Sequence, residues 1–218
     1  MANIGLLGGT FDPIHFGHLR MAQELIEALN LDTVKFIPAA TPPHKARPAV
    51  APAHRSAMLQ LAIANNTGFE FDGRELLRDG PSYSIDTLRS LRSELNAHDS
   101  LVLFIGSDAF SQFNTWHHWQ DIISLCHIAL VQRPGQAKPD GLNEELLSFL
   151  HDHYTENSLD LVREPTGLIT MPAITPLAIS STAIRAQLKN QQAARYLTPD
   201  CVLDYIAQHR LYQGALPC

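Results

Sequence analysis

The chain has 218 residues, of which 45% are hydrophobic and 17% charged, and this balance provides enough apolar side chain for one full hydrophobic core. Its net charge of −6 argues against a generally basic surface for nucleic acid, so an anionic ligand would need a locally basic pocket. No run of about 18 apolar residues is present, and the N-terminus carries no charged leader segment. We therefore expect a cytoplasmic protein without a membrane or nucleic-acid partner.

Short apolar runs and amphipathic stretches alternate along the first part of the chain. The apolar runs predict strands at 4–7, 34–38, 69–72, 101–106 and 127–131, and the amphipathic stretches predict helices at 19–26, 55–64, 84–96 and 119–124. Strands that alternate with helices are typical of a parallel sheet covered on both faces. We expect an α/β protein with a Rossmann-like, doubly wound parallel sheet flanked by helices.

The pattern loosens after residue 135, and helices become more frequent than strands. Residues 136–140 indicate a surface loop, 143–151 a helix, 168–171 a further strand, and 181–188 and 199–209 two helices, the second with Thr198 as its N-cap. We expect residues 1–218 to form one domain, with an α/β core to about residue 180 and a small C-terminal helical part from 181 to 218.

A glycine-containing segment separates the first strand from the first helix, and it reads Gly8-Gly9-Thr10-Phe11-Asp12-Pro13-Ile14-His15-Phe16-Gly17-His18. Glycine lets the backbone approach an anion closely, and a helix start presents unpaired N–H groups with a partial positive charge. His15 and His18 add two side-chain donors at the same place. The segment therefore predicts a phosphate-binding turn, with zinc ligation or a purely structural role for the two histidines as alternatives.

Three further observations narrow the class of protein. The fingerprint Gly-x-Gly-x-x-Gly is absent near the first strand, which argues against nicotinamide-dependent hydride transfer. Asp12, which precedes Pro13, is expected to hold the turn by hydrogen bonds from its side-chain oxygen to nearby N–H groups rather than to act as a base. Cys126, Cys201 and Cys218 are odd in number and lack Cys-x-x-Cys spacing, so we expect unpaired thiols without a catalytic role.

The tetrapeptide His15-Phe16-Gly17-His18 resembles the His-x-Gly-His element of the nucleotidyltransferase superfamily. Later motifs resemble, in the same order, those of the bacterial nicotinate-nucleotide adenylyltransferase family: Pro42-Pro43-His44-Lys45, Pro81-Ser82-Tyr83-Ser84-Ile85-Asp86-Thr87, Gly106-Ser107-Asp108 followed by Trp116, and Ile179-Ser180-Ser181-Thr182-Ala183-Ile184-Arg185. The resemblance spans about Ile4 to Arg210. Ser84 stands where the family often has threonine, and this difference keeps the hydroxyl.

This resemblance implies an enzyme of NAD biosynthesis that transfers AMP from ATP to nicotinate mononucleotide and releases pyrophosphate. It implies direct in-line attack on the α-phosphorus, without a covalent enzyme intermediate. Magnesium is expected through the ATP phosphates, with no protein metal site and no tightly bound organic cofactor. The alternatives are an adenylyltransferase for nicotinamide mononucleotide or phosphopantetheine, and a nonenzymatic nucleotide sensor. The oligomeric state is left open.

The same resemblance implies three groups of site residues. The catalytic group is His15, His18, Lys45 and Arg185, in which His18 meets the α-phosphate and His15 the rest of the triphosphate. The ATP-binding and phosphate-binding group is Gly8, Gly9, Thr10, Phe11, Gly106, Asp108, Ser181 and Thr182. The nicotinate-nucleotide group is Tyr83, Ser84, Trp116 and His117, with the indole of Trp116 as the platform for the nicotinate ring.

Structural alternatives remain for several of these residues. Lys45 also suits the role of a solvated surface residue. Arg185 also suits an exposed position in which its only contact is with a residue one turn away on the same helix. Asp108 also suits the N-cap of a helix. Trp116 also suits core packing, and core packing is the favoured role of Trp119.

Overall fold

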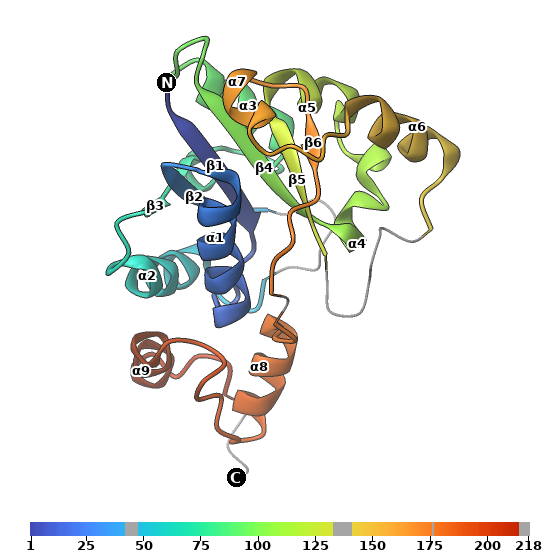
Figure 1. The fold of residues 1–218 in the computed structure, drawn as a ribbon. Helices are drawn as coiled ribbons and strands as arrows, with labels where there is room; N and C mark the ends of the chain where they lie inside the picture. The colour runs from blue at the N-terminus through green and yellow to red at the C-terminus, as the bar shows by residue number, and fades with distance from the viewer. Residues whose placement is uncertain (42–47, 133–140, 176, 214–218) are drawn as a thin grey trace.

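Six strands form one sheet in the computed structural model, which describes residues 1–41, 48–132, 141–175 and 177–213 (Figure 1). The strands are β1 (Asn3–Gly9), β2 (Thr33–Pro38), β3 (Phe69–Phe71), β4 (Ser100–Gly106), β5 (His127–Val131) and β6 (Ile169–Thr170). All pairs are parallel, and the order across the sheet is β3-β2-β1-β4-β5-β6. The predicted Rossmann-like parallel sheet is confirmed.

Helices flank this sheet on both faces (Figure 1). The longer ones are α1 (Phe16–Leu29), α2 (Pro52–Ile63), α3 (Ser84–Arg92), α5 (Trp119–Leu125), α6 (Glu144–His153), α8 (Ser181–Lys189) and α9 (Asp200–Gln208), and each corresponds to a predicted helix. The short helices η1 (Arg74–Leu77), α4 (Ser107–Phe110), η2 (Phe113–Thr115) and α7 (Asp160–Arg163) were not predicted. A single helical turn has too few residues to show an amphipathic period.

Side chains alternate along the central strand β4 between two hydrophobic cores. Val102 and Phe104 pack in the core that contains the buried faces of α1 and α2. Leu101, Leu103 and Ile105 pack in the core that contains the buried faces of α3 and α5. Burial on both faces explains why this strand is a continuous apolar run in the sequence.

The C-terminal helices α8 and α9 lie together at one end of the molecule, away from α3, α5 and α6 (Figure 1). The segment between them binds the start of α1. The backbone N–H of Phe16 donates to the carbonyl of Leu197 at 3.0 Å, and the Thr198 hydroxyl donates to the carbonyl of Ile14 at 2.7 Å. The C-terminal part is therefore joined directly to the loop between β1 and α1.

The predicted N-cap role of Thr198 is wrong. The N-cap of α9 is Pro199, and no side chain caps this helix. The Thr198 hydroxyl is buried against Ile14 instead, where it satisfies a carbonyl from the other end of the chain. A local capping pattern carries no information about such a distant acceptor.

Helix α3 ends at Arg92, four residues before the predicted end at 96. The carboxylate of Asp99 accepts hydrogen bonds from the backbone and the side-chain amide of Asn96 at 3.0 and 3.1 Å. The backbone N–H of Asp99 in turn donates to the carbonyl of Asn96 at 3.1 Å. This turn competes with continuation of the helix, as Asn and Asp side chains commonly do.

Cys126 and Cys201 are free thiols, in agreement with the prediction, whereas Cys218 and the predicted loop at 136–140 lie outside the described residues. Burial raises the pKa of the Cys126 thiol to about 12, so it stays protonated at neutral pH and is a poor nucleophile. Within the described ranges, no helix is both long enough and apolar enough to cross a membrane.

Candidate active site

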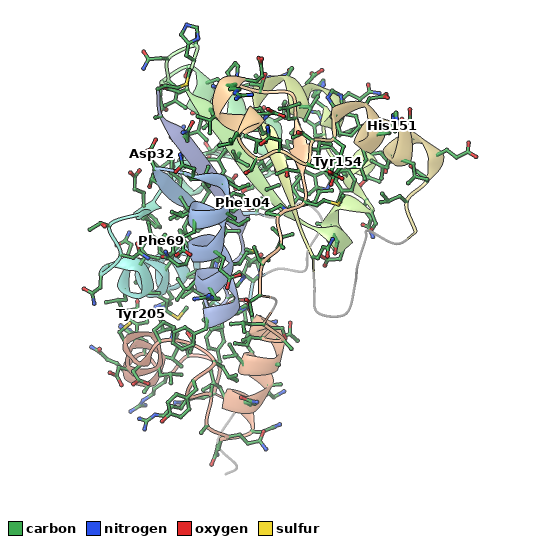
Figure 2. All side chains as sticks on the ribbon, in the orientation of Figure 1. Asp32, Phe69, Phe104, His151, Tyr154 and Tyr205 are labelled. Carbon is green, nitrogen blue, oxygen red and sulfur yellow. The ribbon has the colours of Figure 1, made fainter. Side chains whose placement is uncertain are left out.

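The strand order places a crevice at the carboxyl ends of β1 and β4. After β1 the chain continues into β2 on one side, and it later returns to β4 on the other side. Open parallel sheets bind their ligands at such a reversal. A cavity of about 1150 Å³ opens there, and Phe104 of β4 (Figure 2) forms part of its wall.

This cavity brings together residues from four of the five sequence motifs. Its wall includes Gly8, Gly9, Thr10, His15, His18, Tyr83, Ser84, Gly106, Asp108, Trp116, His117, Ser181, Thr182 and Arg185. The fifth motif, residues 42–45 with Lys45, lies outside the described residues. Phe11 is the one predicted residue of the described set whose side chain is buried in the core instead of lining the cavity.

The two histidines occupy the first turn of α1. His15 is the N-cap residue, and its carbonyl accepts hydrogen bonds from the N–H groups of His18 and Leu19 at 3.0 and 3.2 Å. The two imidazole rings stack with their centroids 3.7 Å apart. A Cβ atom on Gly17 would lie 3.0 Å from the His15 ring, so a larger residue there would press on the stacked pair.

Phe11 supports the histidine pair from the core side. Its side chain is only 1% exposed, and its ring meets His18 edge-on at a centroid distance of 5.1 Å. Its backbone has φ of 48°, a left-handed conformation that costs a non-glycine residue some energy. The Phe11 ring therefore fixes His18 from the core side, and Phe11 is not among the residues that line the cavity.

Burial changes the character of His15. Its side chain is 6% exposed, and removal from water lowers its pKa to about 4. The ring is therefore neutral at pH 7, with one nitrogen as donor and the other as acceptor. In the part of the chain that the structure describes, Nδ1 of His15 and the hydroxyl of Thr10 are buried without a hydrogen-bond partner. Such atoms are costly unless a ligand or water satisfies them.

Helix α8 contributes Ser181, Thr182 and Arg185 to the cavity wall. Ser180 is its N-cap and accepts a hydrogen bond from the N–H of Ala183, while the Ser181 hydroxyl donates to the carbonyl of Pro13 at 2.9 Å. Arg185 donates through Nη2 to the Thr182 hydroxyl at 3.3 Å.

Arg185 also reaches across to the loop between β1 and α1. Its Nη1 donates to the main-chain carbonyl of Asp12 at 2.7 Å. The alternative of a surface arginine with only a contact on its own helix is wrong, because this hydrogen bond joins residues at opposite ends of the sequence.

Asp12 holds the loop, as predicted, but through partners far away in the chain. One carboxylate oxygen accepts the Tyr212 hydroxyl at 2.6 Å, and the other accepts the backbone N–H of Ala49 at 2.6 Å. The side chain is 4% exposed. Both oxygens are therefore occupied, which suits a structural role better than that of a base.

Aromatic side chains also line the cavity. Tyr83 is the N-cap residue of α3, and its ring stacks on His117 at a centroid distance of 4.4 Å. Trp116 is half-buried and packs against Phe113 at 5.3 Å, so it combines core packing with a position on the cavity wall. Trp119 meets Phe113 at 5.8 Å in the same core, as predicted.

The alternative role of Asp108 as an N-cap is wrong. The N-cap position of α4 is Gly106, and Asp108 lies in the first turn of that helix. Its side chain is exposed and lines the cavity. An acidic residue in a first turn suits the helix dipole, and it is also accessible to a ligand.

Two residues near the site were missed by sequence reasoning. Arg55 is completely buried on the apolar face of α2, and its Nη1 donates to the carbonyl of Thr10 at 2.7 Å. Met58 and Leu59 follow Arg55 by three and four residues, so the helical period places all three on the same face and could have predicted the burial of Arg55. Tyr212 had no such signal, because its contact with the loop is purely tertiary.

No group of three or more His, Cys, Asp or Glu side chains in the described ranges could hold a metal ion. His15 and His18 therefore find no third protein ligand there, and the zinc alternative has no support from these residues. The neutral ring of His15, stacked on His18, instead offers one hydrogen-bond donor and one acceptor.

The cytidylyltransferase-like family model matches residues 6–187. A probable nicotinate-nucleotide adenylyltransferase of Dechloromonas aromatica is 47% identical, over 97% of this chain and 98% of its own length. A second such protein, from Pseudomonas aeruginosa strain UCBPP-PA14, is 45% identical over 97% of each chain. This chain belongs to the nicotinate-nucleotide adenylyltransferase family.

Solved structures show the same fold as this nicotinate-nucleotide adenylyltransferase family member. Plasmodium falciparum nicotinic acid mononucleotide adenylyltransferase complexed with NaAD has a TM-score of 0.69 at 18% identity, over 97% of this chain and 98% of that one. A putative nicotinate-nucleotide adenylyltransferase from Vibrio parahaemolyticus has a TM-score of 0.63 at 14% identity, over 94% of this chain and 99% of that one. All predicted site residues of this family member lie within the matched span 6–187, whereas Tyr212 lies beyond it.

We expect His15 to be neutral in the free protein. In an NMR titration its ring should show a pKa of about 4, and pyrophosphate should raise this value because an anion favours the charged imidazolium.

Because the pKa of His15 in the folded protein lies below the ordinary 6.5, the unfolded chain binds this proton first, and the stability of the fold falls as the pH drops from 6.5 through 4. A His15→Asn variant should lose less stability over that interval. A pKa near 6.5 in the free protein would contradict the buried neutral ring.

Proposed function

We propose that the phosphate of nicotinate mononucleotide attacks the α-phosphorus of ATP directly in this cavity. The family reaction is adenylyl transfer from ATP to nicotinate mononucleotide in NAD biosynthesis. An oxygen of the mononucleotide phosphate forms a new bond to the α-phosphorus. The bond to the bridging oxygen of the β-phosphate breaks, and pyrophosphate leaves with the electron pair. No covalent enzyme intermediate is required.

One observation carries the proposal: a single cavity is lined both by the histidines and glycines of the loop between β1 and α1 and by Tyr83, Trp116 and His117. Its volume of about 1150 Å³ exceeds that of usual single-ligand pockets, which reach roughly 1,000 Å³, so two substrates have room together. The two sets of residues also differ in chemistry, as a triphosphate and a nicotinate ring require.

In the first set, His18 is proposed to donate to the α-phosphate and His15 to the remaining triphosphate. Their stacking fixes both rings before the substrate arrives, which is the condition for donors to stabilise a transition state. The backbone of residues 8–11 is proposed to bind phosphate oxygens. Support comes from Gly8, which is exposed and has nothing within 4 Å of the position of a Cβ atom, so a phosphate can approach closely.

Helix α8 is proposed as a second anion-binding surface. Thr182 and Arg185 line the cavity, and the two hydrogen bonds of the guanidinium to protein oxygens leave further donors for phosphate. Ser181 contributes at the helix start, although its hydroxyl is already bonded to Pro13. Lys45 stays a predicted phosphate-binding cation, since it lies outside the described residues.

Among the aromatic residues, Trp116 is proposed as the stacking platform for the nicotinate ring, with Tyr83 and His117 beside it. The nicotinate carboxylate is proposed to meet the hydroxyl of Ser84 and the N–H groups at the start of α3. Ser84 is the first residue of this helix and lines the cavity, and first-turn N–H groups have no partner within their own helix. Such donors suit a carboxylate better than an amide, which carries less charge.

Gly106 and Asp108 are proposed to bind the ribose and adenine side of ATP. Both residues line the cavity where β4 ends and α4 begins. The carboxylate offers acceptor oxygens for hydroxyl or amino groups. A Cβ atom on Gly106 would lie 2.7 Å from Oδ1 of Asp108, so the glycine gives this carboxylate its room.

Magnesium is proposed to enter with ATP. The described residues contain no cluster of His, Cys, Asp and Glu able to cage a metal ion, which fits a cation carried by triphosphate oxygens and water. Bound in this way, magnesium would offset phosphate charge during transfer. The protein residues above would still bind and orient the phosphates.

We also propose that the whole chain acts as a single nucleotidyltransferase domain. Support comes from the cavity wall, which includes residues of the sheet, of α3 and of α8. The C-terminal part would then be a component of the site instead of an independent module.

Acceptor choice tests this function directly. With ATP present, pyrophosphate release should be at least about tenfold more efficient with nicotinate mononucleotide than with nicotinamide mononucleotide, because N–H donors prefer a carboxylate. The comparison uses kcat/KM for the two acceptors at saturating ATP. A preference for the amide would overturn the proposed acceptor.

Replacement of His18 tests the proposed phosphate binding. The variant His18→Ala should lower kcat by about 10²-fold or more while ATP affinity stays within about tenfold, because the donor acts mainly in the transition state. His98→Ala, a change at an exposed histidine away from the cavity, should leave kcat unchanged. Near-normal turnover by His18→Ala would remove this residue from the phosphate-binding role.

Replacement of Trp116 tests the proposed nicotinate binding. We expect Trp116→Ala to raise the KM for nicotinate mononucleotide by about tenfold or more, with a much smaller change in the KM for ATP. Trp119→Ala should instead reduce stability without altering the ratio of the two KM values, because Trp119 packs in the core with Phe113. Equal effects of Trp116→Ala on both KM values would place the nicotinate ring elsewhere.

A further inference from the structure

The carboxylate of Asp12 is a buried charge beside the cavity. Its Oδ1 accepts the hydroxyl of Tyr212 at 2.6 Å, and its Oδ2 accepts the backbone N–H of Ala49 at 2.6 Å. These partners come from the segment before α2 and from the chain after α9. Both oxygens of Asp12 thus have a donor of their own.

Arg185 lies next to this carboxylate without a hydrogen bond to it. Its Nη1 is 3.9 Å from Oδ2 of Asp12 and donates to the main-chain carbonyl of Asp12 instead. Arginine and a carboxylate normally form two parallel hydrogen bonds when both groups are free. Here that arrangement is absent, and the guanidinium, about one-third exposed, lines the cavity.

We infer that Tyr212 is a positioning residue that keeps Arg185 available to the ATP phosphates by occupying the carboxylate of Asp12. The inference rests on the proposed phosphate-binding role of Arg185. Without the tyrosine hydroxyl, Oδ1 of Asp12 would lose its donor. The guanidinium, whose Nη1 already lies 3.9 Å from Oδ2 of the same carboxylate, would then be drawn to Asp12, and a paired Arg185 would offer fewer donors and less charge to ATP.

The turn of the chain at the end of α9 directs Tyr212 toward the carboxylate of Asp12. Arg210 adopts the left-handed conformation with φ of 51°, its N–H donates to Ala207, and the N–H of Leu211 donates to Ile206 at 3.0 Å. This pair of hydrogen bonds is the Schellman pattern, which turns the chain sharply after a helix. Leu211 is buried and Tyr212 packs against the same core, so the direction of the tyrosine is set by packing.

The charges around Asp12 also favour Tyr212, and not Arg185, as the hydrogen-bond partner of its carboxylate. Burial, together with the neighbouring Asp12 carboxylate, raises the pKa of Tyr212, so its hydroxyl remains a donor at any working pH. The Arg55 guanidinium is buried close enough to interact electrostatically with Asp12 and Tyr212. Arg55 therefore offsets part of the negative charge of Asp12, and Arg185 is not required for that purpose.

The test compares Tyr212→Phe with the parent protein and then repeats the change in an Arg185→Met background. We expect Tyr212→Phe to raise the KM for ATP by about fivefold, with the KM for nicotinate mononucleotide changed less than about twofold. In the Arg185→Met background the same substitution should change the KM for ATP by less than about twofold, because the residue through which it acts is gone.

Tyr205→Phe is the matched control. Tyr205 lies on α9 (Figure 2), and its hydroxyl is 3.0 Å from Nδ1 of His54, away from the cavity wall. This variant should leave both KM values unchanged. Because Tyr212→Phe removes one oxygen atom and keeps the packed ring, urea unfolding of each variant checks that the protein remains folded.

These outcomes distinguish a failure of the Tyr212 inference from a failure of the proposed function on which it rests. If Arg185→Met alone leaves the KM for ATP unchanged, the phosphate role of Arg185 fails, and the inference fails with it. If Arg185→Met raises the KM but Tyr212→Phe has no effect, or has the same effect in both backgrounds, the inference is overturned while the proposed function stands. A loss confined to the parent background supports the positioning role.

Discussion

The conformation of the loop between β1 and α1 depends on the C-terminal part of the chain. Residues 12–14 and 16 all hydrogen-bond to residues between 181 and 212: Arg185 and Tyr212 to Asp12, Ser181 to Pro13, Thr198 to Ile14, and Leu197 to Phe16. A glycine-containing loop has much conformational freedom when it is isolated. These bonds remove that freedom before a ligand binds, so the loop that lines the cavity is fixed in advance.

A net charge of −6 is compatible with anionic substrates because donors for an anion are needed only at the cavity wall, which includes Arg185. The starts of α1, α3 and α8 all contribute residues to the wall, and helix starts carry partial positive charge on backbone N–H groups. His15 adds neutral hydrogen bonding and Arg185 adds full charge. The chemistry of phosphoryl transfer needs such fixed donors more than it needs proton transfer.

Elements defined by local periodicity could be predicted from the sequence, and elements defined by distant partners could not. The strand at β5 was predicted with its observed bounds, because a continuous apolar run is visible in the chain itself. The end of α3 and the role of Thr198 were wrong, since Asp99 and Ile14 respectively supply competing hydrogen bonds. The candidate site residues were predicted from motifs, while Arg55 and Tyr212 belong to no local motif of phosphate binding.

The sequence by itself determined the parallel α/β architecture and the family, because these follow from apolar periodicity and from ordered short motifs. It also predicted a phosphate-binding turn. Tertiary structure alone decided how these motifs act together. It buried His15, which lowers its pKa, and it stacked that ring on His18. It also brought Tyr212 to Asp12, 200 positions away in the chain. Burial and long-range hydrogen bonds depend on which segments meet in space, and a local sequence pattern does not encode that.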